Sequence, residues 1–518
     1  MLDLLFKNAK VLDGTGAPWF RADVGIKDGY IAKIGKITEE AKIVVDATGK
    51  YLAPGFIDAH SHSDYTLLTN PSADSKVMQG VTLEVIGQCG SSAAPRGLGF
   101  TRDEDELPQE IKTPGWTNMA SYLELLEAQG TSINVAPLVG HGTIRRQVMG
   151  SDKRAPNSHE LSLMKDLVSD AMEQGAFGIS TGLIYVPGTF SDTYELLELA
   201  KVASRYGGLY FTHLRDEREK LIEALEEAIE IGFAAEIPVQ ISHLKVMGKS
   251  NWGKVNEAIC AIEKAREKGL DITADQYPYI ASSTGLSAFV PTWVWSGSKD
   301  AGLKRIKDPY QRQKIIEEIS GAEDWASFVI SSLQNEKDEI FIGKNLVEIG
   351  EYLGVSPEEA CLTLLERNNG NVQIINFAMC EEDVKTVMKQ PWVMAGSDAS
   401  SLNKDSAKGK PHPRAYGTFV RILGKYVREE KHLRLEEAVR KMTSLPAMRL
   451  GLQDRGILKE NMRADLVLFD ETEVADKSTF FDPHQYAQGI YWVVVNGVPV
   501  VQDQIHTGKR PGKVLRRS

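Results

Sequence analysis

Cysteine is scarce in this chain, and long apolar runs are absent from it. The 518 residues include only 4 cysteines, which do not suggest a disulfide framework in a chain of this length. No apolar stretch reaches the ~18 residues of a membrane-spanning helix. The first residues, MLDLLFKNAKVLDGTG, carry neither a long apolar core nor a cleavage-site pattern. We therefore expect a cytoplasmic protein without a membrane partner.

A surplus of positive charge is also missing. The formal net charge is −11 and is spread along the chain rather than gathered in a tail, which argues against nucleic acid as the main partner. Apolar residues make up 42% and charged residues 25%, an ordinary soluble composition with enough apolar mass for a large core. A small molecule is the expected ligand, and the sequence leaves a homo-oligomer open.

The chain has two textures. Residues 1–54 and 450–518 contain short β-rich runs separated by turn signals such as Asp28-Gly29 and Asn496-Gly497. Residues 55–449 alternate strand-like runs with amphipathic helical stretches, a pattern that predicts a parallel sheet covered by helices. We expect an α/β fold, a (β/α)8 TIM-type barrel, with an insertion at about residues 282–343, where the alternation breaks.

There are nine candidate strands for an eight-stranded barrel, so one of the last three must be extra or belong to an insertion. The candidates are Gly55–His60, Thr82–Gly87, Ile133–Leu138, Gly178–Gly182, Leu209–His213, Pro238–His243, Asp271–Asp275, Asn371–Phe377 and Pro391–Gly396.

Histidines and acids gather at the ends of these runs, where a barrel of this type places its chemistry. His60 and His62 close the run GFIDAHSH, and at i and i+2 of a strand they share one face. His213 ends GLYFTH, His243 ends VQISH, and Asp398 follows WVMAGS. Cys89 follows the Thr82–Gly87 run.

Each residue alone also fits a plain structural role. A single strand-end histidine is more often a hydrogen-bonded structural residue than a ligand, a lone cysteine is usually a small buried apolar side chain, and an aspartate after a strand is often a helix cap. Four of only 10 histidines fall at predicted strand ends together with one cysteine and one aspartate. That joint pattern favours a metal site, although His141 also lies near a strand end.

Several motifs carry a family resemblance. GFIDAHSHSD, His213, His243 and the GSD at Gly396–Asp398 resemble the metal-binding signature of the amidohydrolase superfamily. Six further segments resemble the D-aminoacylase (N-acyl-D-amino-acid deacylase) family: IGQCG, STGLIYVPG, THLRDE, ISHLK, DQYPY and HPRAYGTF. The similarity runs from Leu2 to about Arg510, and it implies that the two β-rich ends form a small β-sandwich.

The resemblance implies a zinc enzyme. Many binuclear relatives bridge two metals with a carboxylated lysine on the fourth strand, but GISTGLIY has none, and the thiolate of Cys89 is the natural substitute. The family pattern implies one tight zinc held by Cys89, His213 and His243, and a second, weak or optional metal near His60 and His62.

Catalytic roles follow from the same pattern. Zinc lowers the pKa of bound water to about 7. Asp398, close to the metal, suits the transfer of a proton from that water to the leaving amine. Tyr185 resembles the family's tyrosine that donates to the substrate carbonyl.

The α-carboxylate of an N-acyl amino acid needs a cation and neutral donors. Arg414 could hold it bidentately, with Tyr277 and Ser283 as further donors and Lys245 as a second cation. Structural alternatives remain: Tyr277 could pack in the core, Ser283 could cap a loop, and Lys245 could be a solvated surface charge. The sequence does not reveal the preferred side chain, although FVPTWVW at Phe289–Trp295 leans toward apolar or bulky groups.

The function expected is zinc-dependent hydrolysis of N-acyl-D-amino acids. A cyclic-amide hydrolase of the hydantoinase or dihydroorotase kind is the alternative enzyme, and its relatives usually carry the bridging lysine that is missing here. A non-catalytic scaffold is a third hypothesis, which loss of metal ligands would signal, yet all of them are present.

Overall fold

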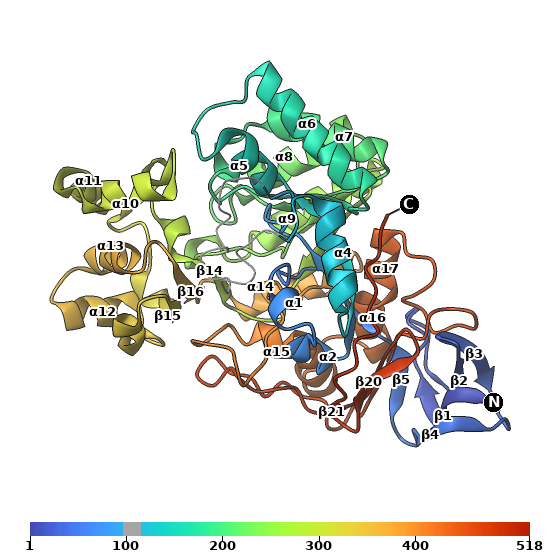
Figure 1. Cartoon of the computed structure of the whole chain (residues 1–518). Helices are drawn as coiled ribbons and strands as arrows, with labels where there is room; N and C mark the ends of the chain where they lie inside the picture. Colours follow the sequence, from blue (N-terminus) through green and yellow to red (C-terminus); the bar gives the residue numbers. More distant parts are fainter. Residues whose placement is uncertain (97–114, 518) are drawn as a thin grey trace.

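Both ends of the chain contribute to one nine-stranded sheet in the computed structural model, which describes residues 1–96 and 115–517 (Figure 1). Its strands are β1 (Leu2–Val11), β2 (Phe20–Lys27), β3 (Tyr30–Gly35), β4 (Ala41–Asp46), β5 (Tyr51–Pro54), β18 (Leu466–Phe469), β19 (Ile490–Val495), β20 (Val498–Gln502) and β21 (Ile505–His506). β5 pairs antiparallel with β18, and this pairing joins the two ends of the chain. The Asn496-Gly497 turn has positive φ at both residues, as a tight hairpin requires.

The central strands are parallel and form two ladders. One contains β6 (Phe56–Asp58), β7 (Val81–Ile86) and β8 (Asn134–Pro137). The other contains β9 (Val139–Gly140), β10 (Gly178–Gly182), β11 (Leu209–His213), β12 (Val239–Ile241), β13 (Ile272–Gln276) and β17 (Val393–Ala395). Every residue in these strands is buried, as expected of parallel strands covered on both faces.

The candidate strand Asn371–Phe377 lies outside these ladders. It forms β16 (Val372–Asn376), which pairs antiparallel with β14 (Ser282–Gly285) and β15 (Phe328–Leu333). It is therefore the extra member of the nine. An apolar β-rich run has the same appearance in a parallel ladder and in a small antiparallel sheet, so periodicity alone did not separate the two.

Helices follow most of the parallel strands. They are α1 (Thr66–Thr69), α2 (Asp74–Val77), α4 (Met119–Gln129), α5 (His141–Met149), α6 (Ser158–Glu173), α7 (Thr193–Arg205), α8 (Leu221–Ala234), α9 (Val255–Glu267), α14 (Glu381–Met388), α15 (Arg414–Arg421), the π-helical η8 (Ile422–Glu429), α16 (Leu435–Met442) and α17 (Ser444–Leu450). Local sequence sets their ends: α6 begins with a capping box between Asn157 and Glu160. None of the helices in the described part of the chain is long and apolar enough to cross a membrane.

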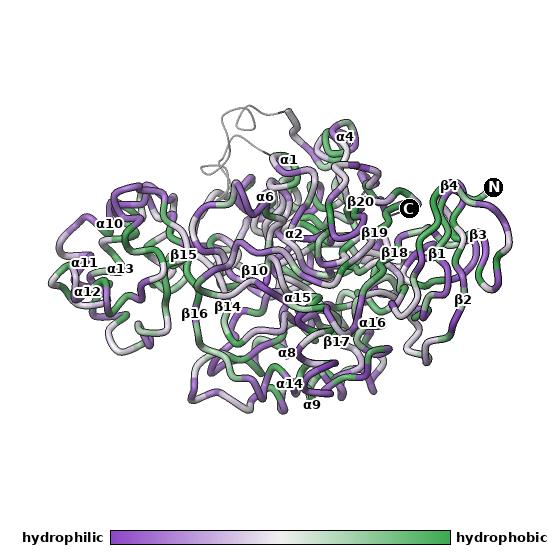
Figure 2. The backbone as a smooth tube through the Cα atoms, turned by 90° about the horizontal axis from the view of Figure 1, so that it is seen from below, coloured by the Kyte–Doolittle hydropathy of each residue, from purple (hydrophilic) through white to green (hydrophobic). Residues whose placement is uncertain are grey.

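A separate lobe lies between β13 and α14. After β14 it contains η4 (Leu286–Phe289), η5 (Thr292–Trp295), α10 (Lys299–Lys307), α11 (Pro309–Ile319), η6 (Trp325–Ser327), β15, η7 (Glu336–Phe341), α12 (Leu346–Leu353), α13 (Pro357–Arg367) and β16. It has its own apolar core, which runs from Leu286 to Ile374. Figures 1 and 2 place this lobe and the terminal sheet at opposite ends of the molecule, with the parallel strands between them.

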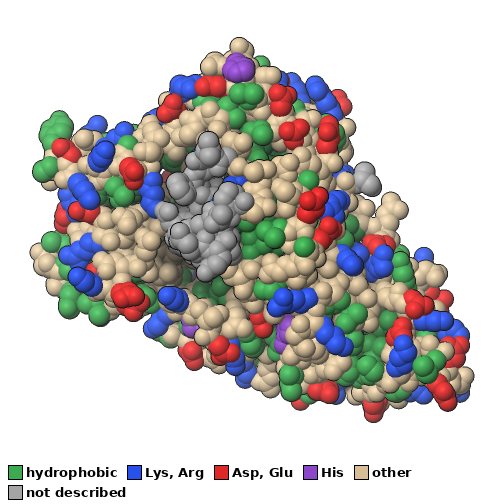
Figure 3. Space-filling model, in the orientation of Figure 1, with side chains coloured by type: hydrophobic (Ala, Val, Ile, Leu, Met, Phe, Trp, Pro, Cys, Tyr) green, Lys and Arg blue, Asp and Glu red, His purple; other side chains and the backbone are tan. Residues whose placement is uncertain are grey.

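Charges of both signs are interspersed over the face in Figure 3, in keeping with a net charge that is spread along the chain. The metal site that the sequence predicts consists mostly of buried residues, which lie between the inserted lobe and the terminal sheet.

Candidate metal centre and active site

Five buried side chains from the C-terminal ends of five strands meet at one place. His60 follows β6, Cys89 follows β7, His213 ends β11, His243 follows β12 and Asp398 follows β17. The Cys89 sulfur lies 3.3 Å from His60 Nε2, 3.7 Å from His213 Nδ1 and 3.4 Å from His243 Nε2. Ligand atoms of His60, Cys89, His243 and Asp398 all lie within 4.8 Å of one another.

These separations fit a zinc ion. Bond lengths of about 2.3 Å to sulfur and about 2.0–2.1 Å to nitrogen, at a tetrahedral angle, place the two ligand atoms about 3.6 Å apart. The Cys89 sulfur stands 3.7 Å from the nearer nitrogen of His213 and 3.4 Å from that of His243. The donor set, one thiol and imidazoles, is the one that zinc prefers.

Unusual backbone angles present three of these residues. Cys89, His243 and Asp398 have φ values of 52°, 36° and 51°. Such left-handed angles are rare outside glycine and occur mostly where the surroundings enforce them, often at functional sites. Gly90 has no room for a side chain, because a Cβ there would lie 2.7 Å from the backbone nitrogen of Gly182. The IGQCG motif therefore supplies the tight turn that carries the thiol.

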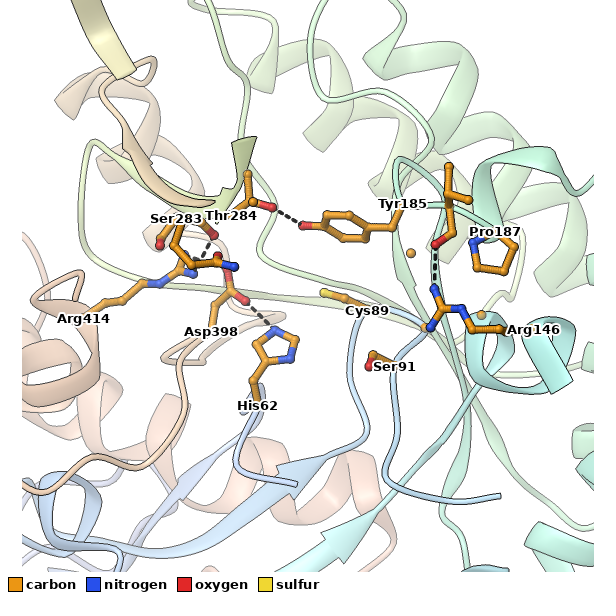
Figure 4. Close-up of a pocket in the computed structure, with 17 residues that line it drawn as sticks. His62, Cys89, Ser91, Arg146, Tyr185, Pro187, Ser283, Thr284, Asp398 and Arg414 are labelled. Atoms are coloured by element: carbon orange, nitrogen blue, oxygen red, sulfur yellow. Dashed lines mark hydrogen bonds and ion pairs between the residues drawn. The ribbon is translucent and has the colours of Figure 1, made fainter. Parts of the chain in front are cut away.

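His62 lies at the edge of the cluster, partly exposed, with its Nε2 2.9 Å from Asp398 Oδ1. Figure 4 shows His62, Asp398 and Cys89 facing the same cavity. His62 is thus brought beside His60, as the i, i+2 spacing predicts, with the two ring centroids 5.3 Å apart, and it lines the same cavity as Cys89.

Glu217 joins the site, and the sequence reasoning missed it. Its carboxylate lies 3.5 Å from His213 Nε2, 3.2 Å from His243 Nδ1 and 2.6 Å from Lys245 Nζ. It faces the outer nitrogens of both imidazoles, an arrangement that typically orients metal-binding histidines. The signal was available in THLRDE, where Glu217 stands four residues after His213.

Asp275 was also missed, although it opens the DQYPY motif. It lies 3.0 Å from His60 Nδ1 and accepts a hydrogen bond of 2.7 Å from the backbone N–H of His243. It is fully buried, and it fixes His60 and the turn at His243 at the same time.

The charges of the cluster shift its acids toward their ionised forms. Burial alone would raise the pKa of the Cys89 thiol, but the nearby His60 and His243 outweigh it and hold that pKa well below its usual value. Burial likewise opposes ionisation of Asp398, yet Arg414 and His243 hold the pKa of its carboxyl well below the usual range. The site therefore favours a thiolate and a carboxylate.

Arg414 enters from the first turn of α15. Its Nη1 lies 2.7 Å from Asp398 Oδ2, its Nη2 donates to the Ser283 carbonyl at 3.2 Å, and its guanidinium carbon lies 4.6 Å from the Tyr277 ring centroid. Burial raises the pKa of Tyr277 well above its usual value, so its hydroxyl stays a donor. His412 accepts from the Arg414 backbone N–H at 3.0 Å and was not singled out from the sequence.

Lys245 is buried rather than solvated. Besides Glu217 it contacts His243 Nδ1 at 2.8 Å and lies 5.9 Å from the Tyr277 ring centroid. Its charge is therefore balanced within the site.

Tyr185 stands opposite Arg414 across the cavity (Figure 4). Its hydroxyl lies 3.0 Å from Thr284 Oγ1, and its ring lies 5.1 Å from that of His213. The loop that carries it is held from α5, where Arg145 Nε donates to the Pro187 carbonyl at 3.2 Å.

Two cavities open on this cluster. One, of about 190 Å³, is lined by His62, Cys89, Ser91, Arg146 and Arg414 among others. The other, of about 360 Å³, extends beneath the inserted lobe. Tyr185, Ser283, Thr284 and Asp398 line both and mark where they meet.

Known proteins resemble this chain over its whole length. A model of the amidohydrolase family matches residues 43–245 and 362–501. The D-aminoacylase of Alcaligenes xylosoxydans xylosoxydans is 38% identical over 100% of this chain and 98% of that protein. The N-acyl-D-glutamate deacylase of the same organism is 38% identical over 100% of this chain and 97% of that protein.

A solved structure agrees. The crystal structure of N-acyl-D-glutamate deacylase from Bordetella bronchiseptica, complexed with zinc and a phosphonate inhibitor that mimics the tetrahedral intermediate, superposes with a TM-score of 0.86, 36% identity and coverage of 99% of both chains. The α/β fold is thus that of the amidohydrolases. The chain belongs to the amidohydrolase family and, within it, to the D-aminoacylases, the N-acyl-D-amino-acid deacylases.

Proposed function

We propose that this chain is a zinc-dependent deacylase that hydrolyses the amide bond of N-acyl-D-amino acids, releasing a carboxylate and a free D-amino acid. The observation that carries the proposal is that Asp398 joins two features of one cavity. Asp398 belongs to a donor set that suits zinc, and its carboxylate lies 2.7 Å from the buried guanidinium of Arg414. Full-length relatives with this activity in their names support it.

The proposed tight zinc site consists of Cys89, His213 and His243, with a second, weak or optional site at His60 and His62 and with Asp398 as a neighbouring ligand. The sulfur–nitrogen separations support the first site. Glu217 supports it too, because it fixes which nitrogen of each imidazole faces the sulfur. When bound, zinc supplies a Lewis acid and lowers the pKa of water.

Asp398 is the proposed proton carrier. Its carboxyl is held ionised by Arg414 and His243, so it can accept a proton from the attacking water and then pass it to the leaving amine. Tyr185 is the proposed donor to the substrate carbonyl, because its hydroxyl faces the junction of the two cavities.

Arg414 is the proposed anchor of the α-carboxylate. Its Nε is buried and has no hydrogen-bond partner among the described residues, whereas its Nη1 lies 2.7 Å from Asp398 Oδ2. A buried donor without a partner is costly, and a substrate carboxylate would satisfy Nε. Tyr277, whose ring centroid lies 4.6 Å from the Arg414 guanidinium carbon, and Ser283, whose carbonyl accepts from Arg414, are the proposed further donors. Lys245, which pairs with Glu217, is the proposed second cation.

The architecture proposed for the catalytic domain, residues 55–449, is a closed (β/α)8 barrel with a small β-sandwich from residues 1–54 and 450–518. Hydrogen bonds between the residues that follow β6 and those at or after the end of β17 support closure: Ala59 N–H donates to the Ala395 carbonyl at 3.3 Å, and Asp398 N–H to the His60 carbonyl at 2.8 Å. Leu138 N–H donates to the Ile86 carbonyl at 2.9 Å, where β8 passes into β9.

A rate screen over N-acetyl-D- and N-acetyl-L-amino acids tests the proposal. We expect hydrolysis of D substrates and little of L substrates, because zinc, Tyr185 and Arg414 would fix the carbonyl and the carboxylate at once. Hydantoin and dihydroorotate serve as the cyclic comparison. Equal rates on D and L acids would reduce the assignment to a general amidohydrolase, and a preference for the cyclic amides would replace it.

A further inference from the structure

The larger cavity beneath the inserted lobe has charges on its wall that the proposed reaction does not use. It is bounded on one side by the loop after β11, with Arg215 and Arg218, and on the other by Phe289, Val290 and the segment that ends in Glu323. Lys245 also lines it, and Ser283 and Asp398 line both this cavity and the smaller one that Arg414 lines. A substrate whose α-carboxylate is held at Arg414 and Tyr277 therefore has this cavity within reach of the substituent on its α-carbon.

The cations of this wall are paired. Arg215 binds Glu227 through Nε and Nη2, each at 2.9 Å, and Lys245 binds Glu217 at 2.6 Å. Arg218 binds Glu323 through Nη1 and Nη2, each at 2.8 Å, and its guanidinium carbon lies 5.4 Å from the Phe289 ring centroid. Among the residues that the structure describes on this wall, each cation thus has a carboxylate partner.

The Arg218–Glu323 pair differs from the others because it joins two parts of the chain 105 residues apart. Arg218 belongs to the loop that follows the metal-site strand β11, whereas Glu323 belongs to the inserted lobe. Both side chains are largely shielded, with 25% and 13% exposed. A partly buried bidentate pair uses the guanidinium edge that a substrate carboxylate would need.

We propose that Glu323 is a specificity-determining residue, which holds Arg218 so that the cavity receives uncharged α-substituents and rejects acidic ones. This inference rests on the deacylase function proposed above. An acidic side chain entering the cavity would meet the carboxylates of Glu318 and Glu323, both on its wall, without a free cation to offset them. The apolar surface of Phe289, Val290 and Pro291 would instead pack against an aliphatic or aromatic group.

The test is a change of preference in Glu323→Gln. The amide keeps the size of the side chain but releases the charge of Arg218. We expect wild-type enzyme to hydrolyse N-acetyl-D-leucine faster than N-acetyl-D-glutamate, and we expect E323Q to raise the kcat/KM ratio of the glutamate to the leucine substrate by about tenfold or more.

Glu318→Gln is the matched control. Glu318 lines the same cavity but accepts from Trp293 Nε1 at 2.9 Å rather than holding Arg218. The E318Q substitution removes one negative charge from the wall without freeing the guanidinium of Arg218. The ratio of kcat/KM for the glutamate substrate to that for the leucine substrate should therefore change much less than in E323Q. The double variant E323Q with Arg218→Met should lose the gain, because the cation that receives the second carboxylate is gone.

Arg218→Met alone keeps the proposal testable if E323Q fails to fold. In that variant the rate on N-acetyl-D-leucine should be largely kept and the poor rate on N-acetyl-D-glutamate should stay poor. The inference is overturned if wild-type enzyme prefers the glutamate substrate, if R218M loses glutamate activity selectively, or if E323Q and E318Q change the ratio equally. Absence of activity on every D substrate would instead contradict the deacylase function itself.

Discussion

Cys89 and Cys361 are both buried, but they lie in two different regions, the strand-end cluster and the inserted lobe. Cys89 stands at the strand ends, where His60 and His243 overcome the effect of burial and hold its pKa well below the usual value. Cys361 lies in α13, within the apolar core of the inserted lobe, where burial raises its pKa. The same residue type is thus prepared as a ligand in one region and as a small apolar side chain in the other.

The two regions differ in the kind of side chain that they bury. The strand-end cluster gathers polar groups that are costly to bury alone and that become useful together, and it accepts left-handed backbone at Cys89, His243 and Asp398. The inserted lobe instead buries a cluster of apolar side chains in its core. Disturbing the first should change chemistry, and disturbing the second should change stability or substrate choice.

The largest effect is expected from Cys89→Ala. Loss of the proposed thiolate ligand should remove most bound zinc and nearly all activity, whereas Cys361→Ala should keep both. Metal analysis of the two purified variants, alongside turnover, measures the contrast. If C89A retained full zinc and near-normal turnover, the ligand assignment would be wrong.

Asp398→Asn should separate metal binding from proton transfer. The amide preserves shape but cannot accept a proton, so kcat should fall by about 10²–10⁴ while zinc is retained. Zinc content and kcat are measured on the same preparation. An active D398N enzyme would place the base elsewhere, and one without zinc would make Asp398 mainly a ligand.

Arg414→Met should lower kcat/KM for N-acyl-D-amino acids. The loss of transition-state stabilisation should be about 1.5–3 kcal/mol, the range for a hydrogen bond to a charged group. The matching amidated substrate, which lacks the anion, should lose less. It need not be indifferent, because Arg414 also pairs with Asp398 at 2.7 Å and its loss disturbs that carboxylate. Equal losses on acid and amide would make Arg414 a positioning residue for Asp398 rather than a substrate anchor.

The smallest effect is expected from Ile330→Val, a change in the core of the inserted lobe. Removing one methylene from a fully buried site should lower stability by about 0.5–1.5 kcal/mol. Zinc content and kcat on N-acetyl-D-leucine should not change. Thermal unfolding and metal analysis check this, and a loss of zinc in I330V would show that the two regions are coupled.

Strand-end histidines were predictable because a strand places its last residues at a fixed edge of a parallel sheet. His60, His213 and His243 needed only that rule and the apolar runs before them. Glu217, Asp275 and His412 also stand in short motifs, THLRDE, DQYPY and HPRAYGTF. Their roles depend on which atoms their side chains face, and the spacing of residues in the sequence does not reveal those contacts.

Other features depended on partners that the sequence does not name. Strand β1 continues past the polar residues Lys7 and Asn8, because a bulge with Asn8 at φ 60° keeps its pairing with β2. Asn371–Phe377 has the composition of a barrel strand, and its position in the small antiparallel sheet follows only from its pairing with β14 and β15.

The sequence by itself determined the α/β class, the family and the residues of the proposed metal site, because periodicity and short motifs act over a few residues. Only the tertiary structure decided that Arg218 meets Glu323, that Arg414 leans on Asp398 and that Glu217 faces two imidazoles from different strands. Such contacts are set by packing between segments far apart in the chain, and the free energy of pairing buried charges depends on distances that no local pattern contains.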